Sequence, residues 1–114
     1  PETAPDFRIQ LALNYIREHL NEPLARDDLA ARMGISPSHF SRLFRNSVRQ
    51  SFPQYLNRLR CEKAAGLLSQ SNRDLLHIAV DCGFQDQSYF SKVFKVHFGT
   101  SPAHFRKYHN ISKI

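Results

Sequence analysis

The sequence predicts an all-α fold: seven helices in two similar halves, joined by a long helix. Apolar residues recur every three or four positions along most of the chain, which is the spacing that buries one face of a helix. A six-residue stretch that begins at Phe40 returns fifty positions later, at Phe90, with the same order of apolar residues, hydroxyls and cations. On either side of these stretches, capping residues, prolines and glycines lie where helices start and stop.

The two copies share one pattern of inward and outward side chains. Their apolar residues follow the spacing i, i+3, i+4 and i+8, so they are expected to face a core. This inward set is Phe40, Leu43, Phe44 and Val48 in the first copy, and Phe90, Val93, Phe94 and Phe98 in the second. The matching outward set is Ser38, Ser41, Arg42 and Arg45 in the first copy, and Ser88, Ser91, Lys92 and Lys95 in the second.

Two helices are predicted ahead of the first copy. Apolar residues indicate a helix over roughly 6–21, which Pro23 stops. A second, short helix over about 24–34 ends at Gly34. Ala25 lies where a capping hydroxyl would help this helix, and it cannot cap.

The first copy lies on a third helix. Ser36 supplies an N-cap hydroxyl and Pro37 suits the first helical position, so the helix is expected over about 37–48. A short helix, a tight turn that contains Gly34 and a second helix together form a helix-turn-helix. The first half of the chain is therefore predicted to be one such unit.

A longer helix is predicted over about 52–70, ended by the polar run that starts at Ser69. In the second half, Asp74 caps a short helix that ends near Gly83. The second copy is then expected on a helix over 87–98 that Asp86 caps, and a last helix over about 102–108. The apolar set of the long helix is Tyr55, Leu56, Leu59, Ala64, Leu67 and Leu68.

The two halves align as an internal duplication. Gly34 corresponds to Gly83 at an offset of 49, and Phe40 corresponds to Phe90 at an offset of 50, so the second turn holds one extra residue. Because only two units are present, this is not a solenoid. The predicted division is 1–51 for the first subdomain, 52–70 for the linker helix and 71–114 for the second subdomain, all within one domain.

Composition narrows the class of partner. Sixteen Lys and Arg against ten Asp and Glu give a net charge of +6, which favours nucleic acid or an anionic membrane surface. The polar start has no signal-peptide pattern, and no stretch approaches the roughly 18 apolar residues of a membrane span. The two cysteines indicate neither a disulfide framework nor a redox motif. We expect a cytoplasmic protein and, since no initiator Met is present, the tail of a longer one.

Duplex DNA is negatively charged and repeats at a fixed distance, as a basic helix displayed twice requires. An α-helix fits the major groove, and successive major grooves on one face recur every ~34 Å. A linker of roughly 19 helical residues spans about 28 Å. The helices at 37–48 and 87–98 are therefore predicted to enter adjacent major grooves.

The outward residues divide between base reading and phosphate binding. Arg42 is expected to donate hydrogen bonds to both O6 and N7 of a guanine, which discriminates against other bases by about 1–3 kcal/mol. Gln87 is suited to adenine. Because the two helices differ at these positions, the target is expected to be asymmetric. The expected base-reading residues are Ser38, His39, Ser41, Arg42, Gln87, Ser88, Ser91 and Lys92. The expected phosphate contacts are Arg45, Arg49, Lys95 and helix N-termini.

Four runs of the sequence resemble a known family. The run 55–68, YLNRLRCEKAAGLL, closely resembles the linker helix of the AraC/XylS transcription regulators. The runs 78–84, 88–95 and 98–106 are similar to the signature of that family. These motifs are long and specific, and the resemblance covers about residues 7–108.

The resemblance implies a seven-helix DNA-binding domain that activates bacterial promoters through contact with RNA polymerase, at the nucleoid when bound. We expect no cofactor. The missing Met and the Pro/Thr-containing start favour a tail fused to an N-terminal effector and dimerisation domain, and a stand-alone regulator is the alternative. The sequence departs from the family at Arg49, where glycine is usual, and at Cys61, where leucine is usual. By the family pattern, the base-reading positions fall on Ser38, Ser41, Arg42, Gln87, Ser88 and Lys92.

The sequence disfavours two other classes of function. An enzyme is disfavoured because the chain has no Gly-rich phosphate loop, no His-Glu-x-x-His and no paired-Cys motif. His97, His104 and His109 lack cysteine or acidic ligands nearby in sequence, so exposed histidines are expected rather than a metal site. The alternative to DNA binding is a helical protein-interaction domain, against which the cations Arg42 and Lys92 argue.

Overall fold

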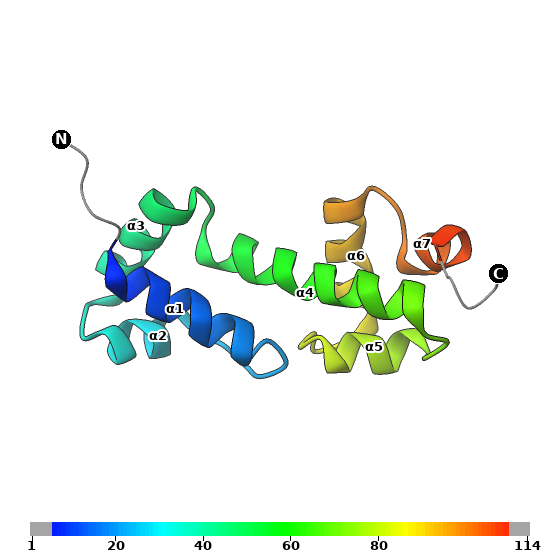
Figure 1. The fold of residues 1–114 in the computed structure, drawn as a ribbon, viewed down its shortest axis with the longest axis horizontal. Coiled ribbons are helices and arrows are strands. Elements are labelled where there is room, and N and C mark those ends of the chain that lie inside the picture. Colours follow the sequence, from blue (N-terminus) through cyan, green and yellow to red (C-terminus); the bar gives the residue numbers. More distant parts are fainter. Residues whose placement is uncertain (1–5, 110–114) are drawn as a thin grey trace. The chain divides into compact units, whose positions relative to one another are not determined.

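The computed structural model describes residues 6–109, and that part of the chain is helical without any strand (Figure 1). The predicted all-α class with seven helices is confirmed. The helices are α1 (Phe7–Glu18), α2 (Arg26–Met33), α3 (Pro37–Val48), α4 (Phe52–Gln70), α5 (Leu75–Asp81), α6 (Gln87–Phe98) and α7 (Pro102–His109).

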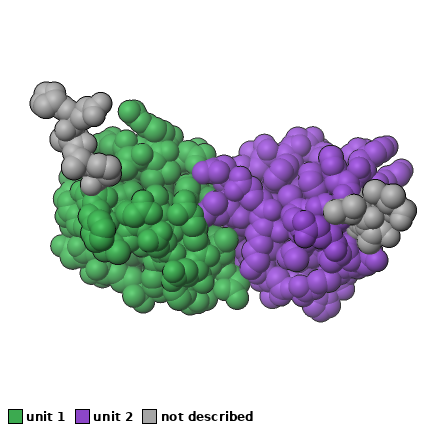
Figure 2. Space-filling view, viewed as in Figure 1, with its two compact units in different colours: residues 1–56 green, residues 57–114 purple. Residues whose placement is uncertain are grey.

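The chain forms two compact units, one ending at Leu56 and the other beginning at Asn57 (Figure 2). The junction lies inside α4, so this helix contributes residues to both units. The buried apolar residues of the first unit are Ile9, Ala12, Ile16, Leu29, Ala30, Phe40, Phe44, Phe52, Tyr55 and Leu56. Those of the second are Cys61, Ala64, Leu68, Ile78, Ala79, Cys82, Phe84, Phe90, Val93 and Phe94.

The second part of α4 serves the second unit as α1 serves the first. Each presents three fully or almost fully buried residues at the spacing i, i+3 and i+7. This spacing places the three on one face of a helix, so each segment is the first of the four helical segments packed around its core. The triplets are Ile9, Ala12 and Ile16 in α1, and Cys61, Ala64 and Leu68 in α4.

The first part of α4 serves the first unit as α7 serves the second. Ser51 Oγ accepts a hydrogen bond from the Gln54 N–H at 3.3 Å, and Gln54 Oε1 accepts one from the Ser51 N–H at 3.1 Å, which is a capping box. Fifty positions later, Ser101 Oγ accepts from the His104 N–H at 3.1 Å and starts α7. A single helix therefore closes one repeat and opens the next.

The predicted helix boundaries are mostly confirmed, and the first helix differs most. Helix α1 begins after Asp6, whose carboxylate accepts the Arg8 N–H at 2.9 Å, and it ends at Glu18, short of the predicted 21. It ends there because the backbone leaves helical geometry at His19 (φ −126°, ψ 30°). Helix α2 begins at Arg26 rather than 24, since Ala25 is extended and makes no side-chain cap.

One inward residue of the second copy is more exposed than predicted. Phe98 is the last residue of α6 and is 37% exposed. Its ring stacks on Phe94, with centroids 4.6 Å apart, and meets Phe105 edge-on at 5.4 Å. The core therefore covers one side of this ring and leaves the other side open.

The exits of α3 and α6 use the same left-handed backbone with different residues. Arg49 has φ 67° and ψ 17°, and the corresponding Gly99 has φ 74° and ψ 3°. Glycine adopts this conformation without strain, whereas an L side chain costs roughly 1–2 kcal/mol. Arg49 is the one residue other than glycine with a positive φ among residues 6–109.

We predict that Arg49→Gly raises the free energy of unfolding by about 1 kcal/mol and that Gly99→Ala lowers it by about the same amount. A methyl group at Gly99 would meet no atom within 4 Å, so backbone strain alone sets the loss. Urea unfolding monitored by circular dichroism measures both changes.

Gly66 provides the matched control for this prediction. It lies within α4, and a methyl group there also meets no atom within 4 Å. Gly66→Ala should stabilise the domain by about 0.5–1 kcal/mol, because alanine is the better helix former. Equal signs for the two Gly→Ala variants would contradict the assignment of strain to the helix exit.

Candidate nucleic-acid interface

Helices α3 and α6 each start with an N-cap residue whose side chain accepts a hydrogen bond from the N–H three residues later. Ser36 Oγ accepts from the His39 N–H at 3.1 Å, and Asp86 Oδ1 accepts from the Tyr89 N–H at 2.7 Å. Both caps were predicted from the sequence and are confirmed. They fix the first turn of each helix, which is where the expected base-reading residues begin.

The turns before these helices are closed by equivalent backbone bonds. The Ile35 N–H donates to the Ala30 carbonyl at 3.1 Å, and the Phe84 N–H donates to the Ala79 carbonyl at 2.9 Å. Such bonds span the end of one helix and set the angle at which the chain enters the next. Each unit thus holds a short helix, a glycine turn and a basic helix in the same order.

Edge-on contacts between aromatic rings seat the basic helices on their units. Phe44 meets Tyr55 of α4 with centroids 5.5 Å apart and planes at 70°, and Phe94 meets Phe105 of α7 at 5.4 Å and 78°. Both phenylalanines are fully buried. Because Phe44 and Phe94 face inward, residues two positions before and one after them are carried outward.

The structure leaves most of the predicted site residues open to solvent. One outward stripe runs along α3, because its residues follow one another three or four positions apart. It consists of Ser38, Ser41, Arg42 and Arg45. A like stripe runs along α6, whereas Arg49 lies just beyond the end of α3. The exposed residues are Ser38, Arg42, Arg45, Arg49, Gln87, Ser88, Lys92 and Lys95, and the half-buried ones are His39, Ser41 and Ser91.

Sequence reasoning missed a cation beside the first stripe. Arg26 opens α2, and its Nη1 donates to Ser41 Oγ at 3.4 Å, while its Nε donates to Asp27 at 3.2 Å. Since Ser41 accepts this bond, its own O–H remains a donor for a ligand. The duplication pairs Arg26 with Leu75, so a comparison of the two copies does not show Arg26 as one of a matched pair of cations.

The two cysteines are buried in the second unit as unreactive thiols. Both are free thiols within the same apolar cluster. Burial raises the pKa of Cys61 to about 12 and that of Cys82 to about 11. Cys61 therefore fills a core position at which the family usually has leucine.

Two kinds of feature are absent from residues 6–109. That part of the chain holds no group of three or more His, Cys, Asp or Glu placed to bind a metal ion. None of its helices combines the length and apolarity that crossing a bilayer requires.

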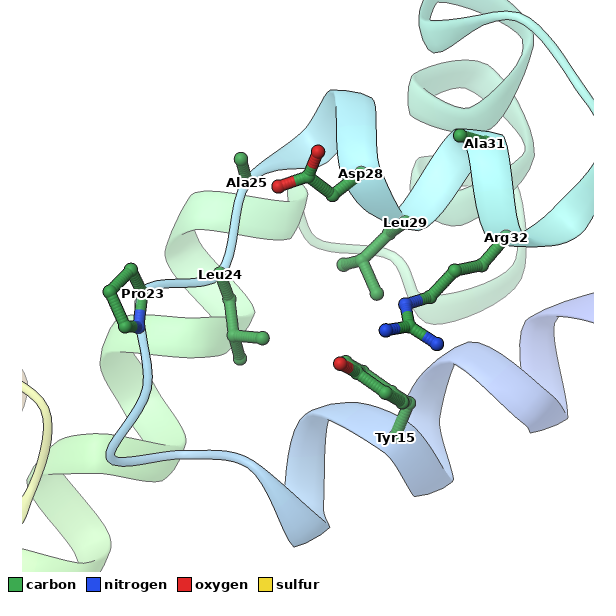
Figure 3. Close-up of a pocket in the computed structure, with 8 residues that line it drawn as sticks. All are labelled: Tyr15, Pro23, Leu24, Ala25, Asp28, Leu29, Ala31 and Arg32. Atoms are coloured by element: carbon green, nitrogen blue, oxygen red, sulfur yellow. The ribbon is translucent and has the colours of Figure 1, made fainter.

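A hollow of about 300 Å³ lies between α1 and α2, away from the predicted site residues (Figure 3). The guanidinium of Arg32 lies over the ring of Tyr15, 4.2 Å from its centroid, which helps hold α2 against α1. No residue of α3 lines this hollow, so it is separate from the basic stripe. Its lining is Tyr15, Pro23, Leu24, Ala25, Asp28, Leu29, Ala31 and Arg32.

A short helix, a glycine turn and an exposed basic helix, seated on an aromatic core, define a helix-turn-helix DNA-binding domain. Residues 29–108 match the model of a family described as a helix-turn-helix domain. The chain is 35% identical over 105 residues to the regulatory protein PocR of Salmonella typhimurium. This match covers 92% of the chain and 35% of PocR, so the chain spans about a third of that relative.

Solved structures agree with this match over nearly the whole chain. The C-terminal domain of AraT, a response regulator from Geobacillus stearothermophilus, superposes with a TM-score of 0.92 at 31% identity, over 97% of this chain and 93% of that one. The DNA-binding domain of the global transcriptional factor AdpA, solved with a target DNA, gives 0.84 at 29% identity, over 93% of each chain. The chain belongs to the AraC/XylS family of DNA-binding transcription regulators, whose domains of this type are not enzymes.

We predict that neither cysteine is alkylated in the folded protein at pH 8, because the reactive species is the thiolate and both pKa values lie far above that pH. In guanidinium chloride both should react. Mass spectrometry after iodoacetamide treatment counts the labels, and rapid labelling of the folded chain would contradict the assignment of inert core thiols.

Proposed function

We propose that this domain binds an asymmetric site in double-stranded promoter DNA and regulates transcription, chiefly by activation through contact with RNA polymerase. In this proposal α3 and α6 enter adjacent major grooves. The observation that carries it is the presence of two exposed basic stripes on helices with the same caps and the same aromatic seating.

Two further features support an asymmetric, two-groove site. Helix α4 has 19 residues, about 28 Å at 1.5 Å per residue, against ~34 Å between successive major grooves. The outward residues differ, since α3 has Pro37 and Arg42 where α6 has Gln87 and Lys92. The AdpA domain solved with a target DNA supports the choice of duplex DNA as the ligand.

The proposed roles follow from reach and charge. Residues at the starts of α3 and α6 read base edges, and cations farther along hold phosphates. We add Arg26 to the phosphate contacts, because its guanidinium already lies against Ser41 on the α3 stripe. The proposed base readers are Ser38, His39, Ser41, Arg42, Gln87, Ser88, Ser91 and Lys92, and the proposed phosphate contacts are Arg26, Arg45, Arg49 and Lys95.

We also propose that the domain works within a longer cytoplasmic regulator, fused to an N-terminal effector and dimerisation domain. The support is the length of PocR, of which this chain covers 35%. The proposed division into 1–51, 52–70 and 71–114 gives α4 the role of linker between two reading units.

Selection of bound sequences from random DNA tests the proposal directly. We expect an asymmetric site with two blocks about one helical turn apart, since unlike helices read unlike base pairs. A single block would mean that only one of the two units reads DNA. No enrichment at all would favour the protein-interaction alternative.

Arginine variants separate base reading from phosphate binding. Arg42→Ala should cost about 1–3 kcal/mol on the selected site and relax selection at one base pair. Arg45→Ala and Arg26→Leu should weaken binding on all sequences alike and lower the salt slope by about one. Fluorescence anisotropy at several salt concentrations measures both quantities.

The matched control for this series is Arg32→Ala. Arg32 lies on the same helix as Arg26 and carries the same charge, but its guanidinium lies over Tyr15 rather than beside α3. It should leave the salt slope almost unchanged. If Arg26→Leu behaves like Arg32→Ala, then Arg26 does not contact phosphate.

A further inference from the structure

A hydrogen bond joins α4 to the first turn of α6. Asn57 Nδ2 donates to the hydroxyl of Tyr89 at 3.2 Å. Tyr89 follows Ser88 directly and precedes Lys92 by one turn, and both neighbours belong to the outward stripe. The bond therefore reaches the part of α6 that is proposed to read bases.

Tyr89 is held at both ends of its side chain. Its ring packs at an oblique angle against Phe84, with centroids 6.2 Å apart, and its hydroxyl accepts the bond from Asn57. Arg60, one turn further along α4, lies in the same neighbourhood; burial lowers the pKa of its guanidinium, and Tyr89 acts in the opposite direction. At 48% exposure, Tyr89 still leaves one side open to solvent.

The first unit does not repeat this arrangement. The residue that corresponds to Tyr89 is His39, whose ring forms no hydrogen bond with any residue in 6–109. Helix α3 is instead touched by α2, through the contact from Arg26 to Ser41. The two basic helices are therefore braced by different elements of their own units.

We propose that Tyr89 is a positioning residue for α6: its bond with Asn57 ties the first turn of α6 to α4 and so fixes the direction in which Ser88 and Lys92 meet DNA. This inference rests on the proposed function. It gives α4 a second task besides joining the units, since the same helix orients one of the two reading surfaces.

The test uses Tyr89→Phe, Asn57→Ala and the double variant in the full chain. Tyr89→Phe removes the hydroxyl and keeps the ring against Phe84. Tyr108→Phe is the matched control, because Tyr108 is exposed and its hydroxyl has no hydrogen bond with a described residue. Two readouts are needed: amide hydrogen exchange in the free protein, and binding to the DNA that the wild type selects.

In the free protein, each single variant should speed exchange in the first turn of α6 and leave α3 unchanged. On DNA, each should bind about two- to tenfold more weakly, the effect of losing one neutral hydrogen bond. The loss of base preference should be confined to one block of the site. The double variant should be no weaker than either single variant, since both remove the same bond.

Three results would overturn the inference. Wild-type exchange and affinity in Tyr89→Phe would show that the bond does not hold α6. Additive losses in the double variant would show that the two residues act separately. A loss of preference spread over both blocks would show a general effect on folding. If the wild type selects no DNA sequence, the proposed function fails, and the exchange data alone decide whether Asn57 and Tyr89 brace α6.

Discussion

Each basic helix is seated on its unit by a buried ring contact. Phe44 against Tyr55, and Phe94 against Phe105, contribute to how far α3 and α6 are rotated about their own axes. Edge-to-face pairs of this kind add roughly 0.5–1.5 kcal/mol beyond the area that they bury. Because side chains on a helix are 100° apart, a small rotation at the buried ring would move every outward cation. The same contact therefore contributes to stability and, in the proposed function, to recognition of DNA.

Local chemistry explains why so much of the fold was predictable. Ser36, Asp74 and Asp86 cap helices through their own side chains, and Gly34 ends α2 in a left-handed conformation that glycine favours. These are short-range rules, so one sequence is sufficient to apply them. The exposure of the predicted site residues followed from helical spacing for the same reason.

The features that were missed depend on packing between distant segments. The double role of α4 was hidden because Cys61 corresponds to Ile9 at an offset of 52, whereas the rest of the duplication runs at 49 or 50. The contacts of Arg26 and Asn57 occur in one unit each, so a comparison of the two copies could not reveal them. The two cores match, whereas the contacts that support the proposed reading surfaces differ between the units.

The shared helix has a consequence for how such a domain can be divided. Leu56 and Asn57 are adjacent in the chain and belong to different units, so no loop separates the two repeats. A cut at this point would create two helix ends, each with about four unpaired backbone groups. The segment that α4 contributes to each core would then fray at its new end. Because Leu56 and Asn57 both lie within α4, a protease meets no loop at this boundary, and any exchange of one repeat for another would have to cut through a helix.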